Sequence, residues 1–266
     1  MPKVSVIMGV YNNNNYELLE KSVDSIINQN FRDWEFIICN DGSTNDSLLK
    51  LKEIEKKDSR IKLVSYKENK GLNHALNECL QRTQGEYIAR QDDDDISKPE
   101  RLEKQVQFLD NNPEYAMVGT CADVFDIRGN WGEYIIPEKP QKNDFLWNSP
   151  FMHPTMMIRK TVLLSGGGYR EAKETRRCED YDLFMRLYAK GYKGYNIQEK
   201  LYYYRIARDE KGKHRPMKYR IDEMIVRFRG YKNMGILLKG IPYVLKPVII
   251  GFIPQSVMNQ IKQSRY

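Results

Sequence analysis

Strand patterns alternate with amphipathic helix patterns four times within residues 1–112, and this alternation constrains the fold more than any other feature of the chain. The strand patterns lie at Val4–Val10, Trp34–Cys39, Ile61–Tyr66 and Glu86–Arg90. The first is a continuous apolar run, which is typical of a strand that is buried on both faces. Because the connections are short, the chain predicts an α/β protein with a doubly wound, mostly parallel, Rossmann-like sheet and right-handed crossovers.

Three polar loops follow strands of this predicted sheet, at Tyr11–Asn15, Asp41–Asp46 and Asp92–Asp95. Ligands of doubly wound sheets bind outside the carboxyl ends of the strands, so we expect these loops to converge on one site. The first strand is not followed by GxGxxG or by GxxxxGK[ST], and the sequence therefore supports neither a dinucleotide site nor a P-loop.

The loop Asp92–Asp95 holds four consecutive carboxylates, which repel one another unless a cation or solvent screens them. Mg²⁺ and Mn²⁺ bind one or two carboxylates together with phosphate oxygens, so the quartet is a candidate metal site. Alternatively, it is a solvated acidic turn, because Ile96–Glu100 opens a helix whose first turn favours negative charge.

Residues 113–215 have a less regular pattern. Strands are expected at Ala116–Phe125, Thr155–Ile158 and Leu201–Arg205, with a short strand or loop at Trp131–Pro137. The glycines at 166–168 and the basic stretch through residue 177 form a loop that either orders on binding or is simply loose. Glu179 and Asp180 then open a helix, where two acids suit the helix dipole and also suit catalysis.

The net charge of +7 favours anionic partners, such as nucleotides, nucleic acid or a membrane surface. The four scattered cysteines lack a CxxC pair and indicate reduced thiols in a cytoplasmic protein. No signal peptide or apolar run of spanning length is apparent, which also predicts a cytoplasmic location.

Residues 216–266 are predicted to form a basic amphipathic extension. The apolar stretch 236–253 is interrupted by Lys239, Pro242, Lys246 and Pro247, which argues against a membrane-spanning helix. A helical segment lying on an anionic membrane surface fits this composition, so we expect peripheral association with the inner face of the plasma membrane. Alternatively, the extension packs on the catalytic domain or on the partner of a homodimer.

Four blocks carry a resemblance to a known family. They are Val4–Asn12, Asn40–Ser43, Gly85–Leu102 with its acids, and Glu179–Leu183. In this order the blocks resemble the family-2 glycosyltransferases of GT-A fold, mostly bacterial enzymes that build surface polysaccharides. The resemblance implies a catalytic domain at 1–215, with a nucleotide-sugar-binding half at 1–112 and an acceptor-binding half at 113–215. It also implies a UDP-sugar donor, a Mn²⁺ or Mg²⁺ ion and inversion at the anomeric carbon.

Donor-binding roles follow from the resemblance. Val10 and Tyr11 would flank the nucleobase, and Asp41 would accept a hydrogen bond from the uracil imide N–H. Asp92, Asp93 and Asp94 would correspond to the DxD motif of the family, with Asp92 on the ribose side and Asp94 on the metal. Asp93 replaces the usual small middle residue, so the metal ligands among Asp92 to Asp95 stay open. Lys70, Gly71 and Asn73 would also lie beside the donor.

Asp180 matches the catalytic base of the family, and Glu179 would help to position the acceptor. His153 would lie near the acceptor or the diphosphate, either as a further metal ligand or as a structural histidine. Arg205, His214 and Arg215 would clamp the diphosphate, although a solvated charge run is the simpler interpretation of these residues.

The sequence thus predicts an inverting, metal-dependent hexosyltransferase that acts on a saccharide or a polyprenyl-diphosphate-linked saccharide and needs no nucleic acid. Capsule, O-antigen or exopolysaccharide synthesis would be its setting. One rival is a sugar-nucleotide nucleotidyltransferase, which needs a glycine-rich basic loop where this chain has Tyr11–Asn15. The other is a non-enzymatic basic binding module, which would not need its acids.

Overall fold

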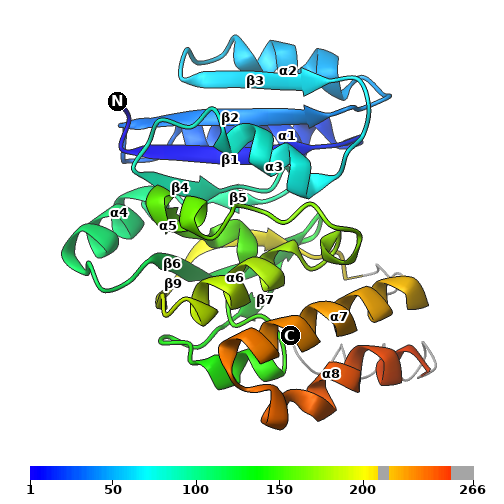
Figure 1. The fold of residues 1–266 in the computed structure, drawn as a ribbon. Coiled ribbons are helices and arrows are strands. Elements are labelled where there is room, and N and C mark those ends of the chain that lie inside the picture. Colours follow the sequence, from blue (N-terminus) through cyan, green and yellow to red (C-terminus); the bar gives the residue numbers. More distant parts are fainter. Residues whose placement is uncertain (209–215, 253–266) are drawn as a thin grey trace.

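The computed structural model describes residues 1–208 and 216–252 (Figure 1). Its first half confirms the predicted alternation of strands and helices. The elements in chain order are β1 (Val4–Val10), α1 (Tyr16–Ile27), β2 (Trp34–Asp41), α2 (Ser47–Glu55), β3 (Ile61–Tyr66), α3 (Leu72–Leu80) and β4 (Tyr87–Arg90).

The second half is built from short strands, helices and turns. These are β5 (Ile96–Ser97), α4 (Arg101–Asn111), β6 (Met117–Asp126), β7 (Gly129–Tyr134), β8 (Met157–Arg159), α5 (Lys160–Ser165), α6 (Glu179–Ala189), β9 (Gly194–Arg205), α7 (Met217–Met234) and α8 (Leu237–Gly251). Short 3-10 helices lie at Lys142–Leu146, His153–Thr155 and Lys173–Thr175.

The strands of the described residues form one nine-stranded sheet in the order β3-β2-β1-β4-β8-β6-β9-β5, with β7 paired to β6. The pairs β1–β2, β1–β4 and β2–β3 are parallel, as predicted. β8 is antiparallel to both β4 and β6, and β9 runs parallel to β6. The fold is therefore the expected α/β sheet, parallel in the first half and mixed in the second.

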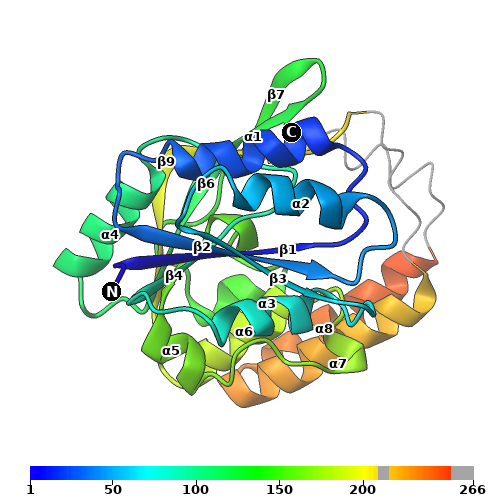
Figure 2. The same ribbon diagram turned by 90° about the horizontal axis from the view of Figure 1, so that it is seen from above.

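Helices cover both faces of the parallel part of the sheet, with α1 and α2 on one face and α3 and α6 on the other (Figure 2). Alternate residues of β1 enter different cores, because successive side chains of a strand point to opposite faces. Val6 and Met8 pack in the core beneath α1, and Ile7 packs in the core beneath α3. This two-sided burial explains why β1 is a continuous apolar run.

The structure departs from the predicted bounds in several places. Ile96–Glu100 does not open a helix, because Ile96 and Ser97 form β5 and pair with β9, and α4 begins only at Arg101. β9 begins at Gly194, well before the predicted start at Leu201, because Gln198, Glu199 and Lys200 lie within a strand whose pairing with β6 is irregular there. Thr155 lies in a 3-10 helix, and β8 begins only at Met157. Because these pairing segments contain polar residues and turns, their sequences lack the alternation of apolar and polar residues that would predict a strand.

The extension packs on the rest of the chain. Arg227 of α7 is 1% exposed and donates to the carbonyl oxygens of Leu146 (3.0 Å) and Trp147 (3.1 Å). The hydroxyls of Tyr231 in α7 and Tyr181 in α6 are 2.9 Å apart. α8 packs in turn against α7 (Figure 1). No helix of residues 1–208 and 216–252 is long and apolar enough to cross a membrane.

Candidate active site

The register of the parallel strands places the predicted loops along one edge of the sheet. Val10 pairs with Asn40, and Ile7 pairs with Arg90, so the residues after β1, β2 and β4 reach the same level. Hydrogen bonds then connect the loops. The Asn13 side-chain amide donates to the Asp93 carboxylate (2.7 Å). Tyr11 lies on this edge and is 49% exposed, whereas Val10 is buried.

Asp41 organises the entry to α3. Its carboxylate accepts hydrogen bonds from the Tyr66 hydroxyl (2.7 Å), the Asn69 amide (2.7 Å) and the backbone N–H groups of Lys70 (2.8 Å) and Gly71 (2.9 Å). The two oxygens of a carboxylate ordinarily accept about four hydrogen bonds, so these four donors use the full capacity of Asp41. A uracil N–H would have to displace one of them, so the role in base recognition stays a prediction.

Each of the four consecutive acids has a different environment. Asp92 pairs with the buried Arg90, and Asp93 accepts from Asn13. Asp94 forms an ion pair with Arg205 (Oδ2 to Nη1, 3.1 Å), and its side chain is 40% exposed. Asp95 is 1% exposed and accepts from the Arg205 backbone N–H (2.7 Å). Asp95 is therefore part of the interior, and Asp92 and Asp94 keep exposed carboxylate surface.

The quartet has an electrostatic penalty that a cation would relieve. Burial, with the charges of Asp94 and Asp92 as further causes, raises the pKa of Asp93 to about 6. Burial and the charge of Asp92 also raise the pKa of Asp94. Within residues 1–208 and 216–252, no group of three or more His, Cys, Asp or Glu side chains converges on one position. Asp92 and Asp94, which keep exposed carboxylate surface, are the residues that could hold an ion whose other ligands are substrate phosphates.

Glu179 and Asp180 form the first turn of α6 and line a pocket of 330 Å³ together with Asp92. The structure therefore brings the predicted base and the acidic loop together, from segments that are far apart in the sequence. Both acids are half-buried. Burial, followed by the charge of Asp180, raises the pKa of Glu179 to about 8, whereas burial raises the pKa of Asp180 to about 6. Both carboxyls therefore ionise less readily than free ones, Glu179 more so than Asp180.

His153 lines the same pocket but is itself buried. Its Nε2 lies 3.0 Å from the Tyr169 hydroxyl. Burial, and then the positive charge of Arg90, holds the pKa of His153 well below its usual range. A neutral, hydrogen-bonded imidazole is what we expect of a histidine with a structural role. Because His153 also lines the pocket, a role on the acceptor side stays a prediction.

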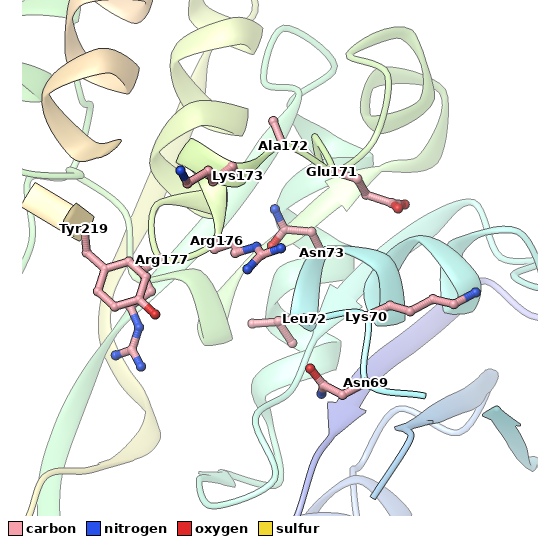
Figure 3. A pocket seen from close by; sticks show the side chains of 11 residues that line it. Asn69, Lys70, Leu72, Asn73, Glu171, Ala172, Lys173, Arg176, Arg177 and Tyr219 are labelled. Carbon is pink, nitrogen blue, oxygen red and sulfur yellow. The ribbon is translucent and has the colours of Figure 1, made fainter. Parts of the chain in front are cut away.

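A second pocket, of 430 Å³, lies between the start of α3 and the segment before α6 (Figure 3). Lys70, Gly71 and Asn73, which the resemblance puts beside the donor, line this pocket, and their donor role stays a prediction. Asn73 is largely buried, and its amide also donates to the Arg170 carbonyl (2.7 Å), which ties α3 to the segment before α6.

Cations of the basic stretch through residue 177, to which the sequence analysis gave no individual roles, also line this second pocket. They are Lys173, Arg176 and Arg177. The Arg177 guanidinium carbon lies 5.0 Å from the ring centroid of Tyr219 in α7 (Figure 3). Their spacing, three cations within five residues just before the Glu-Asp pair, is the sequence signal for such a cluster. The pocket offers positive charge to an anionic ligand.

Of the predicted diphosphate clamp, Arg205 lies at the acidic loop through its contact with Asp94. His214 and Arg215 fall outside the described residues. Arg90, which sequence reasoning missed, is 2% exposed at the end of β4 and pairs with Asp92. Its charge lowers the pKa of Glu179, against the larger effect of burial. Arg90 therefore supplies the positive charge that lets several acids share this edge of the sheet.

Comparison with known proteins places this geometry in a family. The model of "Glycosyl transferase family 2" matches residues 5–166. EpsE of Bacillus subtilis (strain 168), whose name assigns it to the glycosyltransferases, is 42% identical over 99% of this chain and 94% of its own length. An Escherichia coli UDP-Gal:alpha-D-GlcNAc-diphosphoundecaprenol beta-1,3-galactosyltransferase is 28% identical over 98% of this chain and 95% of its own length.

Among solved structures, S. aureus TarS 1–349 in complex with UDP-GlcNAc superposes with a TM-score of 0.71 at 19% sequence identity. The match covers 92% of this chain and 73% of that one. At this identity the likeness concerns the fold, which is the GT-A fold expected from the sequence. The family model and the sequence relatives together establish that the chain belongs to glycosyl transferase family 2.

Proposed function

We propose that this chain transfers a hexose or N-acetylhexosamine from a UDP-sugar to a saccharide or a polyprenyl-diphosphate-linked saccharide, with inversion at the anomeric carbon. The observation that carries the proposal is the pocket shared by Asp92 and Asp180, next to Asp94 and Arg205. It supports a reaction in which the donor lies along the acidic loop and the acceptor enters against α6.

On the donor side, Asp94 and Asp92 would hold a Mn²⁺ or Mg²⁺ ion, which would stabilise the negative charge that grows on the departing diphosphate. Arg205 is within reach of the same charge, because its guanidinium already lies 3.1 Å from Asp94. Tyr11, on the rim and half-exposed, offers its ring to the nucleobase, and Lys70 with Gly71 would border the donor at the start of α3.

On the acceptor side, Asp180 would take the proton from the attacking hydroxyl. Its lower pKa supports this assignment, because Asp180 ionises more readily than Glu179, whose pKa burial raises further. Glu179 would then donate a hydrogen bond to the acceptor. Attack from the side opposite the leaving diphosphate inverts the anomeric centre.

The setting we propose is the synthesis of a surface polysaccharide, such as a capsule, an O-antigen or an exopolysaccharide, at the cytoplasmic face of the membrane. The names of the relatives support it, since they include amylovoran and O-antigen biosynthesis glycosyltransferases and an enzyme acting on a diphosphoundecaprenol acceptor.

A thermal-shift screen of nucleotide sugars, with and without Mn²⁺, tests the proposal. A ligand that binds only the folded state raises the melting temperature by mass action. The largest Mn²⁺-dependent shift should come from a UDP-sugar. Equal shifts for all nucleotides, or no dependence on the metal, would contradict the donor and cofactor proposed.

A further inference from the structure

The outer face of α8 is an exposed apolar stripe. Leu238, Ile241, Leu245, Ile249 and Phe252 follow one another at intervals of three or four residues, which puts them on one side of the helix. Each is between 47% and 88% exposed. Single exposed apolar residues are ordinary on a protein surface, but a continuous row of them marks a surface that meets an apolar partner.

The opposite face of α8 packs against the protein, so the stripe faces outward. Gly240, Val244 and Pro247 are buried there. A Cβ atom at Gly240 would lie 2.4 Å from the ring of Tyr231 in α7, so the two helices approach as closely as glycine allows. Because α7 is itself anchored by the buried Arg227, the stripe is held outward by packing and is not a surface left over from a loose tail.

The charge around the stripe has one sign. From Met224 to Phe252 the chain contains five Lys and Arg residues and no Asp or Glu. Lys239 is exposed next to Leu238, and Lys232 is exposed in the last turn of α7. Basic residues around an apolar helix face complement an anionic leaflet. A neutral apolar surface of another protein would offer these cations no negative charge, so an anionic leaflet fits the stripe better.

An aromatic corner continues the surface beyond α8. Trp147 is 51% exposed, and its ring centroid lies 6.3 Å from that of Tyr243 in α8. The Lys246 ammonium nitrogen lies 3.6 Å from the Trp147 ring centroid. Trp and Tyr concentrate at membrane interfaces, and Lys places its charge at the headgroup level while its stem covers apolar surface.

A groove runs from this corner to the catalytic pocket. It has a volume of 340 Å³ and is lined by Trp147, Pro150 and the segment 133–137. Tyr134, Asn148 and Ser149 line both this groove and the 330 Å³ pocket that contains Asp92 and Asp180. In Figure 1 and Figure 2 the C-terminal end of α8 also lies on the side to which β2 and β3 point.

We propose that the outer face of α8 docks on an anionic lipid leaflet and that the groove beside Trp147 leads a lipid-linked acceptor from the leaflet to Asp180. The second half of this statement rests on the function proposed above, whereas the docking of α8 does not. Membrane contact then restricts the acceptor to molecules whose lipid end stays in the leaflet.

Vesicle flotation of the full chain tests the docking surface. We expect the protein to bind vesicles of phosphatidylcholine with phosphatidylglycerol, to bind phosphatidylcholine alone about tenfold more weakly, and to be released by salt. Leu245→Glu with Ile249→Glu should weaken binding to the anionic vesicles about tenfold or more. The matched control, Leu49→Glu with Ile127→Glu, changes two exposed apolar residues away from α8 and should bind like the wild type.

Three results would overturn the docking. One is undiminished vesicle binding by the α8 variant. Another is a lowered melting temperature in that variant, which would mean that the stripe is covered within the chain. The third is a wild-type dimer that the variant converts to a monomer without any vesicle binding by either, which would make the stripe a subunit interface. Mn²⁺-dependent stabilisation by UDP, measured on the same samples, reports separately on the proposed function.

The groove is tested with phosphatidylcholine vesicles that contain undecaprenyl diphosphate. This lipid should increase retention of the wild type, and Ile135→Glu, which places a charge in the groove away from α8, should lose that increase while keeping binding to phosphatidylglycerol. Equal retention of both proteins on the polyprenyl vesicles would overturn the acceptor route and leave the docking of α8 intact.

Discussion

Glu179 and Asp180 illustrate how two neighbouring carboxyls acquire different protonation states. Both lie in the first turn of α6, where the helix dipole favours negative charge. Glu179 is nevertheless the harder group to ionise, because its Oε2 is buried and has no hydrogen-bond partner among the described residues. Asp180 accepts backbone N–H groups, including that of Tyr181, which offset part of the effect of burial on its pKa.

The proposed division of labour predicts different kinetics for two isosteric variants. Asp180→Asn removes the proton acceptor and should lower kcat by about 10²–10⁴-fold, with donor binding unchanged. Glu179→Gln replaces a carboxylic acid with an amide that still donates a hydrogen bond, so kcat should stay within about tenfold at pH 7. Steady-state rates and donor-induced thermal shifts check both. Loss of donor binding in Asp180→Asn would refute its role as base.

Glu179 should also make the stability of the protein depend on pH. Its pKa rises from 4.5 in the unfolded chain to about 8 in the folded protein. The folded state therefore holds more protons between these values, and the free energy of unfolding falls as pH rises through this window. Glu179→Gln should melt a few degrees above the wild type at pH 9, and the difference should vanish near pH 4. Thermal unfolding across this range measures the effect, and a parallel pair of pH profiles would contradict it.

At the scale of elements, the end of β4 distributes its four acids among separate partners. Arg90 pairs with Asp92, and Arg205 contacts Asp94 by its side chain and Asp95 by its backbone. β9 therefore helps to set the acidic loop, since Arg205 is its last residue. A strand of the second half of the chain thereby shapes the acidic loop that follows β4.

This division predicts which carboxylate the metal needs. Asp94→Asn should abolish the Mn²⁺-dependent part of the UDP-induced thermal shift and leave the melting temperature of the ligand-free protein unchanged or slightly raised, because it removes a repelling charge. Asp93→Asn is the matched control. It lies in the same loop but faces Asn13, so most of the Mn²⁺ dependence should remain. The opposite pattern would assign the metal to Asp93.

At the scale of the whole molecule, the sequence predicts the parallel half well, because strands such as β1 that are buried on both faces must be apolar throughout. It predicts the mixed half less well. The pairing of β9 with β6 joins segments some 80 residues apart through polar positions such as Lys200, and no local period reveals it. The resemblance predicts that Asp92 and Asp180 lie near each other, but the raised pKa of Asp180 depends on burial that only the folded chain defines. The inward role of Asp41 likewise depends on donors 25 to 30 residues away.

The sequence of the extension looks like that of a separate segment, but in the structure α7 packs on the rest of the chain. Arg227 and Tyr231 of α7 reach the carbonyl oxygen of Leu146 and the hydroxyl of Tyr181, so α7 completes the core behind α6. Removing Arg227 would break its buried ion pair with Glu223 and take one of the donors from the carbonyl oxygens of Leu146 and Trp147. Such losses typically destabilise a protein by about 3 kcal/mol.

We therefore expect Arg227→Ala to lower the free energy of unfolding of the entire chain by about that amount, with far-UV circular dichroism and tryptophan fluorescence reporting one coincident urea transition. Trp34 is buried in β2, on the far side of the sheet order from α7, and makes fluorescence sensitive to the donor half. Arg229→Ala is the control on the same helix. Its side chain is 51% exposed and pairs with Glu174, so its loss should change stability by no more than about 1 kcal/mol. An early, separate transition in Arg227→Ala that leaves UDP-induced stabilisation intact would instead show that residues 216–252 fold independently of the catalytic core.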